Sequence, residues 1–334
     1  MGLISNNIKE EMNKIIVKNF KQNSYKKVCI IGSGYVGSTI AYALMMKELP
    51  DEIILIDINT AITEAEMLDI RHGIPYMGMC DIKSGDYSDI VDSDLIVITA
   101  GRNRKQGESR LDLAQDNTKI AKGIATEIKK YYNSGVILVV TNPVDILTTK
   151  YTEWLGLPKG KVFGTGCILD SSRFTNVIAD YLNINPEVIN AQIIGEHGSS
   201  QIAMWSKVTV AGMPIEEYTK FLGIEFNDSI KKEIEQVVND MGSTIIKGKG
   251  KTHYGIATCV CYIADAILNK RATIASVTSV LDGEYGIKNV AMSVPSIITS
   301  EGIERTLADY LSDVEYKEMR GSYEILEKTL ETLI

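Results

Sequence analysis

His197 is the residue of this chain whose type and neighbours point most directly to chemistry. It is one of three histidines and lies in the run IGEHG at residues 194–198. Upstream, the run LDSSR at residues 169–173 supplies Asp170 and Arg173. An imidazole transfers protons near neutral pH, a carboxylate can orient it, and a guanidinium can bind a substrate acid through two parallel hydrogen bonds. These residue types together indicate proton transfer on a small carboxylic acid.

A glycine-rich turn near the N-terminus offers a place for a dinucleotide. The run GSGYVG at residues 32–37 follows an apolar stretch and precedes a helix-forming one. In a strand–turn–helix of this kind, Gly32 permits the tight turn, Gly34 lets the backbone approach pyrophosphate, and Gly37 lets helix and strand pack closely. The N–H groups at the start of the helix then face the anion. We therefore expect cofactor contacts from Gly32, Gly34, Tyr35, Val36 and Gly37, although glycines can also serve a tight turn alone.

An acidic residue at the end of the second apolar run supports the dinucleotide interpretation. Asp57 follows residues 53–56 and lies about twenty residues after Gly37, the spacing typical of such sites. Its carboxylate can accept hydrogen bonds from the adenosine ribose hydroxyls and would repel a 2′-phosphate. The cofactor is thus expected to be NAD. Combined with His197, this predicts hydride transfer in which a histidine handles the proton.

Two further strand ends are expected to line the nicotinamide. In a doubly wound sheet, ligands bind outside the carboxyl ends of the strands. The residues at these ends are Thr99, Ala100, Gly101, Thr141 and Asn142. Asn142 could hydrogen-bond the cofactor carboxamide or the substrate oxygen. The alternative is a turn asparagine before Pro143.

The elements that must position these side chains follow from the apolar pattern. Short runs rich in valine and isoleucine, at residues 28–31, 53–56, 95–99 and 136–141, alternate with stretches of helical length at 38–47, 61–72 and 111–130. Continuous apolar strands alternating with helices indicate a parallel sheet covered on both faces. After about residue 165 the pattern is mixed, with long polar helices at 230–246, 254–269 and 312–333 and hairpin-like turns around Gly212 and Gly283.

We therefore predict an α/β fold: a Rossmann-type, doubly wound parallel sheet followed by an α+β substrate domain. The expected boundaries are an N-terminal arm at 1–25, an NAD-binding domain at 26–164 and a catalytic domain at 165–334. A helix near 252–269 could pack back on the first domain. The arm carries an apolar stripe of Met12, Ile15, Ile16 and Phe20 that needs a partner surface, either a second subunit or its own.

Composition excludes several classes of function. The chain has 334 residues, 45% of them hydrophobic, and a formal net charge of −8, which argues against nucleic acid and anionic membrane surfaces as partners. No apolar run is long enough to cross a membrane, and the first 25 residues do not resemble a signal peptide. The five cysteines lack the spacing of metal or redox motifs, so we expect no metal and a reducing, cytoplasmic location.

The motifs taken together resemble one family, the NAD-dependent L-lactate/malate dehydrogenases, from about Lys27 to the C-terminus. They are GSGYVG at 32–37, GESRL at 107–111, TNPVD at 141–145, LDSSR at 169–173, GEHG at 195–198 and LDGEYG at 281–286. The bacterial lactate branch fits best. The resemblance implies reversible hydride transfer from NADH to pyruvate, giving L-lactate, as in glycolysis and fermentation.

The resemblance also implies a role for each residue. His197 would exchange the proton, Asp170 would hold the other ring nitrogen, and Arg173 would bind the substrate carboxylate. Arg110, at the end of a lid-like segment at 101–110, would polarise the substrate carbonyl when the lid closes. Thr252 would contact the substrate and Asn117 the cofactor. One departure is Ser199, which replaces the family's usual aspartate after GEHG.

The identity of the 2-hydroxy acid depends on Arg104 in the lid. Malate enzymes of the family have arginine there, and a guanidinium closed over a methyl group would be a buried, unpaired charge. Against this, Glu108 could neutralise Arg104 if the lid becomes helical. Thr252 resembles the lactate branch, and arginine also occurs in bacterial lactate enzymes. We expect lactate, with malate as the alternative.

Assembly and regulation are expected from the resemblance alone. The arm is similar to the one that joins subunits in the tetrameric lactate branch, which implies a homotetramer. Many bacterial relatives bind fructose 1,6-bisphosphate through an arginine and a histidine, at positions that are Thr175 and Asn190 here. Neither is cationic, so we expect no activation by that sugar. An NAD-binding protein without catalytic activity is an alternative of a different class.

Overall fold

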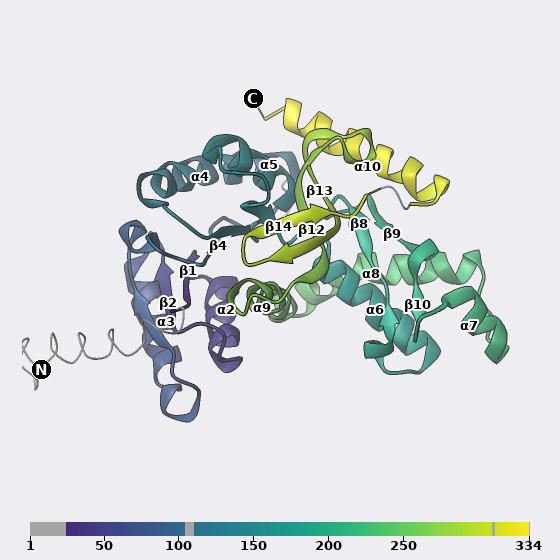
Figure 1. Ribbon diagram of the computed structural model, residues 1–334, viewed down its shortest axis with the longest axis horizontal. Helices are drawn as coiled ribbons and strands as arrows, with labels where there is room; N and C mark the ends of the chain where they lie inside the picture. The colour runs from purple at the N-terminus through teal and green to yellow at the C-terminus, as the bar shows by residue number, and fades with distance from the viewer. Residues whose placement is uncertain (1–24, 104–109, 309–310, 334) are drawn as a thin grey trace, which may run out of the picture.

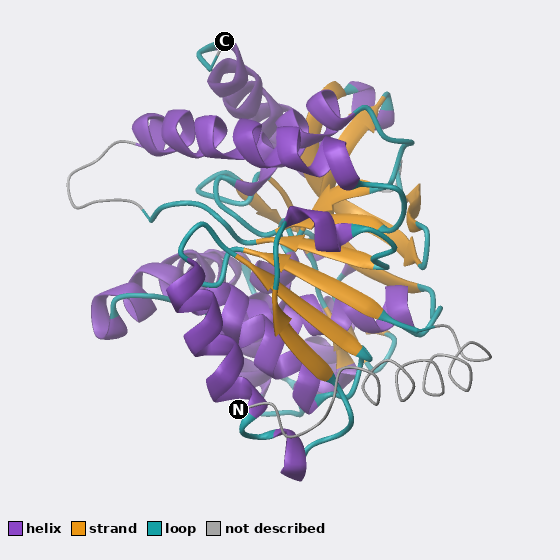
Figure 2. Cartoon of the chain, turned by 90° about the vertical axis from the view of Figure 1, so that its left-hand side faces the viewer, coloured by secondary structure: helices purple, strands orange, loops and turns teal. Residues whose placement is uncertain are grey.

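The first half of the chain forms a parallel sheet with helices on both faces. The computed structural model describes residues 25–103, 110–308 and 311–333. The strands are β1 (Lys27–Ile31), β2 (Glu52–Ile56), β3 (Asp81–Ser84), β4 (Leu95–Ile98), β5 (Val136–Val139) and β6 (Val162–Gly164). The helices are α2 (Tyr35–Met46), α3 (Thr60–Arg71), α4 (Arg110–Tyr131) and α5 (Val144–Leu155). These strands run parallel in the order β3-β2-β1-β4-β5-β6, which confirms the predicted doubly wound arrangement (Figures 1 and 2).

The second half continues the same sheet with antiparallel strands. It contains β7 (Ile189–Asn190), β8 (Ile193–Gly195), β9 (Gln201–Ala203), β10 (Thr209–Val210), β11 (Met213–Pro214), β12 (Thr273–Asp282), β13 (Lys288–Thr299) and β14 (Gly302–Thr306). Its helices are α6 (Ile168–Leu182), α7 (Ile215–Leu222), α8 (Asp228–Lys249), α9 (Tyr254–Leu268) and α10 (Asp313–Glu331). The order β6-β12-β13-β8-β9 joins the two halves edge to edge, and the predicted turns near Gly212 and Gly283 connect β10 to β11 and β12 to β13.

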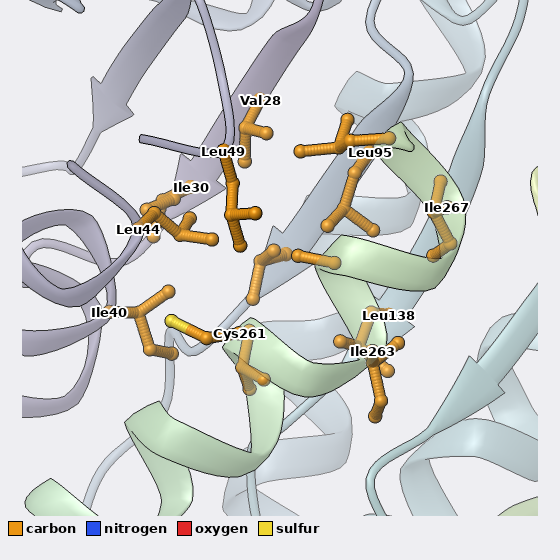
Figure 3. Packing of buried hydrophobic residues seen from close by; sticks show 14 of the residues in the cluster. Val28, Ile30, Ile40, Leu44, Leu49, Leu95, Leu138, Cys261, Ile263 and Ile267 are labelled. Carbon is orange, nitrogen blue, oxygen red and sulfur yellow. The ribbon is translucent and has the colours of Figure 1, made fainter. Parts of the chain in front are cut away.

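Alternate residues of the central strands bury opposite faces of the sheet. From β1, Val28 and Ile30 lie in one apolar core, whereas Cys29 and Ile31 lie in another. The first core is closed by α2 and α9, and the second by α4 and α5. Helix α9 thus packs on the first half of the chain, although it follows the second half in sequence. In Figure 3, Cys261 and Ile263 of α9 lie among side chains of α2 and the strands.

Two helix boundaries bear on the site. We predicted that the helix after the glycine turn begins at residue 38, but α2 begins at Tyr35 with Gly34 as its N-cap. Its first turn therefore lies directly on the glycine loop. Helix α6 begins at Ile168, so the LDSSR run belongs to its first two turns. Across the described part of the chain, no helix is long and apolar enough to cross a membrane.

Candidate active site

Helix α6 carries the acidic and basic residues of the site on one face. Asp170 lies in its first turn, where the helix dipole favours a carboxylate, and Arg173 lies three residues later. An Arg173 Nη1–H donates to Asp170 Oδ1 over 2.9 Å, and the two side chains are 15% and 4% exposed. The pair is thus largely withdrawn from water and fixes the guanidinium beside the carboxylate.

His197 approaches α6 from the turn between β8 and β9. Neighbouring strands pair at Gly164 of β6, Thr278 of β12, Ser293 of β13 and Gly195 of β8. This register places the end of β8, and the turn that follows it, level with the end of β6. Ser293 Oγ also accepts the N–H of Cys167, immediately before α6. Two elements far apart in sequence therefore reach the same place.

The imidazole and the carboxylate form a short hydrogen bond. His197 Nδ1 lies 2.6 Å from Asp170 Oδ2, and the histidine side chain is 23% exposed. Asp170 thus bridges His197 through one oxygen and Arg173 through the other. With Nδ1 held in this way, Nε2 is the ring nitrogen left to exchange a proton with a ligand.

The charges around His197 favour its protonated form. Burial lowers the pKa of the imidazole, but the charge and hydrogen bond of Asp170 outweigh burial and raise it to about 9. Burial raises the pKa of Asp170, and the opposing charges of His197 and Arg173 bring it below the usual value for aspartate. At neutral pH the site therefore holds an imidazolium, a carboxylate and a guanidinium.

The glycine turn has the geometry that a dinucleotide requires. Gly32 has φ +107°, and a Cβ there would lie 2.5 Å from the N of Ala100; a Cβ on Gly37 would lie 1.8 Å from the O of Gly32. The hydroxyl of Thr99 donates to the O of Gly32 over 2.8 Å and ties the turn to β4. By contrast, a Cβ on Gly34 would meet nothing within 4 Å. The backbone is thus open at Gly34, beside the first N–H groups of α2, where NAD would place its pyrophosphate.

Asp57 joins the end of β2 to the glycine turn. Its Oδ2 accepts the N–H of Ser33 over 2.7 Å, and its Oδ1 accepts the N–H of Asn59 over 2.9 Å. Two ionised oxygens offer about four acceptor sites, so capacity remains for ribose hydroxyls. The described residues therefore fit the adenosine side of NAD.

The tips of β4 and β5 are joined by hydrogen bonds. The hydroxyl of Thr141 donates to the O of Ala100 over 2.9 Å. The amide of Asn117, 2% exposed, donates to the O of Asn142 and accepts from the N of Arg102. Asn117 would consequently support NAD by holding these loops in place, whereas the side chain of Asn142 is exposed at the sheet edge.

Some predicted site residues lie outside the described part of the chain. Arg104 and the rest of residues 104–109 lie outside the described residues, as do residues 1–24 of the arm. Arg110 begins α4, but its side chain is not among those described.

Another predicted substrate contact, Thr252, is half-buried just before α9. The neighbouring His253 contacts the hydroxyl of Thr39 through Nδ1 at 3.1 Å.

The described cysteines are all buried and free. Cys167 lies with Asp170 and His197 in a group whose potential metal-ligand atoms are within 4.8 Å of one another. Burial raises the pKa of the Cys167 thiol well above its usual range, and both oxygens of Asp170 already have partners. Asp170 is thus already engaged by His197 and Arg173 within this cluster.

Two side chains that the sequence analysis gave no role hold the backbone of the histidine turn. His197 N donates to Asp145 Oδ2 over 2.7 Å, and Glu196 N donates to Ser322 Oγ over 2.8 Å. Asp145 lies in the quoted TNPVD motif, but only its burial and contact reveal a role. Ser322 lies in the middle of α10, and its surrounding sequence carries no signal of this contact.

Comparison with known proteins agrees with this geometry over both halves of the chain. Residues 26–164 match the NAD-binding domain model of the lactate/malate dehydrogenases, and residues 167–334 match the alpha/beta C-terminal domain model of the same group. The chain belongs to the lactate/malate dehydrogenase family. The matched NAD-binding domain includes the glycine turn and Asp57, so NAD is the cofactor of this fold.

The similar proteins include enzymes of the lactate branch. The L-lactate dehydrogenases of Acetivibrio thermocellus and Thermoanaerobacter sp. are 41% and 42% identical to the chain, each over 92% of it and over 97% and 99% of their own lengths. The ligand-bound structure of the minor L-lactate dehydrogenase from Enterococcus mundtii has a TM-score of 0.89 and 35% identity, covering 92% of the chain and 98% of the relative. The L-lactate dehydrogenase of Clostridium thermocellum has a TM-score of 0.81 and 43% identity, covering 92% and 99%.

Proposed function

We propose that this chain is an L-lactate dehydrogenase, which reversibly reduces pyruvate to L-lactate with NADH. The observation that carries the proposal is the bridging carboxylate of Asp170, hydrogen-bonded to His197 at 2.6 Å and to Arg173 at 2.9 Å. One small site thus presents a proton donor beside a group that binds a carboxylate, as a 2-oxo acid requires. The similarity to L-lactate dehydrogenases over most of the chain supports the choice.

Each residue has a distinct part in the reaction. Bound NADH would supply the hydride. Arg173 would hold the pyruvate carboxylate through paired N–H groups and turn the ketone towards His197. His197 would give the Nε2 proton to the ketone oxygen during reduction and take it back during oxidation, while Asp170 keeps the ring oriented.

The remaining site residues complete the proposal. Arg110 would stabilise the negative charge that develops on the substrate oxygen. Asn142 and Thr252 would border the substrate, and Arg104 would face its third carbon. Residues 101–110 would act as the lid. We retain the division into an arm at 1–25, an NAD-binding part at 26–164 and a catalytic part at 165–334.

A panel of 2-oxo acids tests the proposal directly. We expect loss of NADH absorbance with pyruvate and a higher kcat/KM for pyruvate than for oxaloacetate. The reverse order by tenfold, about 1.4 kcal/mol in the barrier, would reassign the enzyme to malate. The similar proteins do not favour malate. Absence of turnover with every 2-oxo acid would instead favour an NAD-binding protein without catalytic activity.

Arg104 is the residue that would shift the preference. We expect Arg104→Gln to change the ratio of kcat/KM for pyruvate and oxaloacetate, because only oxaloacetate brings a second carboxylate. The Kd for NADH should change little, which a fluorescence titration measures. A large loss of NADH affinity with an unchanged ratio would remove Arg104 from substrate selection.

Assembly and regulation follow as part of the proposal. We propose a cytoplasmic homotetramer that regenerates NAD+ during fermentation, with the N-terminal arm joining subunits. Light scattering on the full chain and on a chain lacking the arm would measure this. Thr175 lies on α6 and Asn190 on β7, and neither can supply a positive charge for a sugar bisphosphate. Added fructose 1,6-bisphosphate should therefore leave the KM for pyruvate unchanged.

A further inference from the structure

Asp145 is a buried carboxylate that neither the proton relay nor the cofactor site requires. It lies in the first turn of α5, next to the strand tip that carries Asn142, and is 2% exposed. Its Oδ2 accepts the backbone N–H of His197 over 2.7 Å. Asp170 reaches the same histidine from α6 through the side chain. Two carboxylates on different helices therefore contact one residue, one at its backbone and one at its ring.

A neutral side chain would be sufficient if the backbone contact were the only purpose. The adjacent peptide shows such a case, because the N–H of Glu196 donates to the hydroxyl of Ser322, which is 1% exposed. Placing an ionisable group in the interior costs more than placing a hydroxyl there, unless its charge has a partner. The partner available to Asp145 is the imidazolium of His197.

The charges around the histidine support this pairing. Asp170 and Asp145 both raise the pKa of His197, and Arg173 lowers it. Burial raises the pKa of Asp145 to about 6. Thr278 and His197 lower this pKa, and the negative charge of Glu196 raises it. Asp145 is therefore mostly ionised at pH 7. Cys167, a further titratable group between these elements, stays a neutral thiol because burial raises its pKa.

We propose that Asp145 is a positioning residue for proton transfer, which fixes the backbone of His197 and stabilises the protonated imidazole by its charge. Asp170 alone would orient the ring, but it shares its charge with Arg173, which also has to bind the substrate. Asp145 adds a negative charge that Arg173 does not contact, and so holds the proton on the imidazole when Arg173 engages an anionic substrate. This role rests on the proposed function of His197 as the proton donor.

The experiment is a pH titration of the imidazole in the full chain. With histidines labelled with nitrogen-15, the chain gives three imidazole signals, and His197→Gln identifies the one that matters. Asp145→Asn keeps an acceptor oxygen for the N–H of His197 but removes the charge. We expect its His197 pKa to fall by about one pH unit. The alkaline limb of kcat/KM for pyruvate should shift by the same amount.

Ser322→Ala is the matched control, because it removes the neutral anchor of the neighbouring peptide. We expect this variant to lose thermal stability and to keep the His197 pKa. An unchanged His197 titration in Asp145→Asn, or an equal shift in both variants, would overturn the proposal and leave Asp145 as a structural anchor.

The wild-type protein provides a second measurement, which does not depend on whether Asp145→Asn folds. Protonation of Asp145 near pH 6 should move the His197 signal before the imidazole itself titrates. Absence of that inflection would also contradict the proposal. Because the titration needs no turnover, it separates the two hypotheses: a shifted pKa without reduction of any 2-oxo acid would refute the proposed function but not the pairing.

Discussion

Asp170 is the residue on which the proposed chemistry depends, because it contacts both the proposed proton donor His197 and the proposed carboxylate-binding Arg173. Its two oxygens contact His197 and Arg173 separately, so neither contact displaces the other. The i, i+3 spacing on α6 sets the contact of Asp170 with Arg173, and only the approach of the β8–β9 turn sets its contact with His197. Asp170 thus combines one local contact and one long-range contact.

Removing the negative charge of Asp170 should lower activity and the pKa of His197. In Asp170→Asn the ring loses the partner that stabilises its protonated form, so we expect kcat/KM for pyruvate to fall by about 10²–10⁴. The alkaline limb of the pH profile should move to lower pH, because the pKa of His197 would no longer be raised to about 9 by that charge.

Asp180→Asn, an exposed change on the same helix, is the control and should keep the wild-type profile. If the alkaline limb of the pH profile of kcat/KM were the same in Asp170→Asn as in the wild type, a group other than Asp170 would set the protonation of His197.

At the scale of elements, the glycine turn between β1 and α2 serves two different needs. Gly37 lies where helix and strand touch, and Gly34 lies where the backbone is open. The same side-chain addition should therefore affect folding at one position and ligand binding at the other.

The two glycines can be compared directly. We expect Gly37→Ala to lower the melting temperature strongly, since the new Cβ would lie 1.8 Å from the O of Gly32. Gly34→Ala, with φ −72° and an open surrounding, should cost less than about 1 kcal/mol in stability. It should nevertheless raise the Kd for NADH at least tenfold, about 1.4 kcal/mol. Calorimetry and fluorescence titration measure the two effects, and normal NADH binding by Gly34→Ala would place the pyrophosphate elsewhere.

For the whole molecule, the site depends on a sheet that continues through both halves of the chain. Helix α9 adds to this, because it closes the core on one face of the first half, and His253 just before it contacts Thr39 of α2. In Figure 1, α9 lies beside α2, and α10 lies over the second half of the sheet. A change in the packing of either half would therefore reach the histidine turn.

The buried ion pair should make the stability of the whole chain depend on pH. The pKa of His197 is raised from an ordinary 6.5 to about 9, so the folded state binds this proton more tightly than the unfolded state. The stabilisation is complete below pH 6.5 and is lost as pH rises through 9. Urea unfolding across this interval should show a decline in the free energy of unfolding that is smaller in His197→Gln. Equal declines in both proteins would assign the effect to other groups.

The sequence by itself determined the parallel sheet, the glycine turn with Asp57, and the residue types of the candidate site. These are local properties: apolar runs set strands, glycines set a turn, and the spacing of Asp170 and Arg173 sets a shared helix face. Only the tertiary structure decided which distant groups meet. The anchors Asp145 and Ser322 reach the histidine turn from α5 and α10, and α9 returns to the first half of the chain. Such contacts depend on how strands pair across the sheet and on what burial does to charge, and neither is a property of a short stretch of sequence.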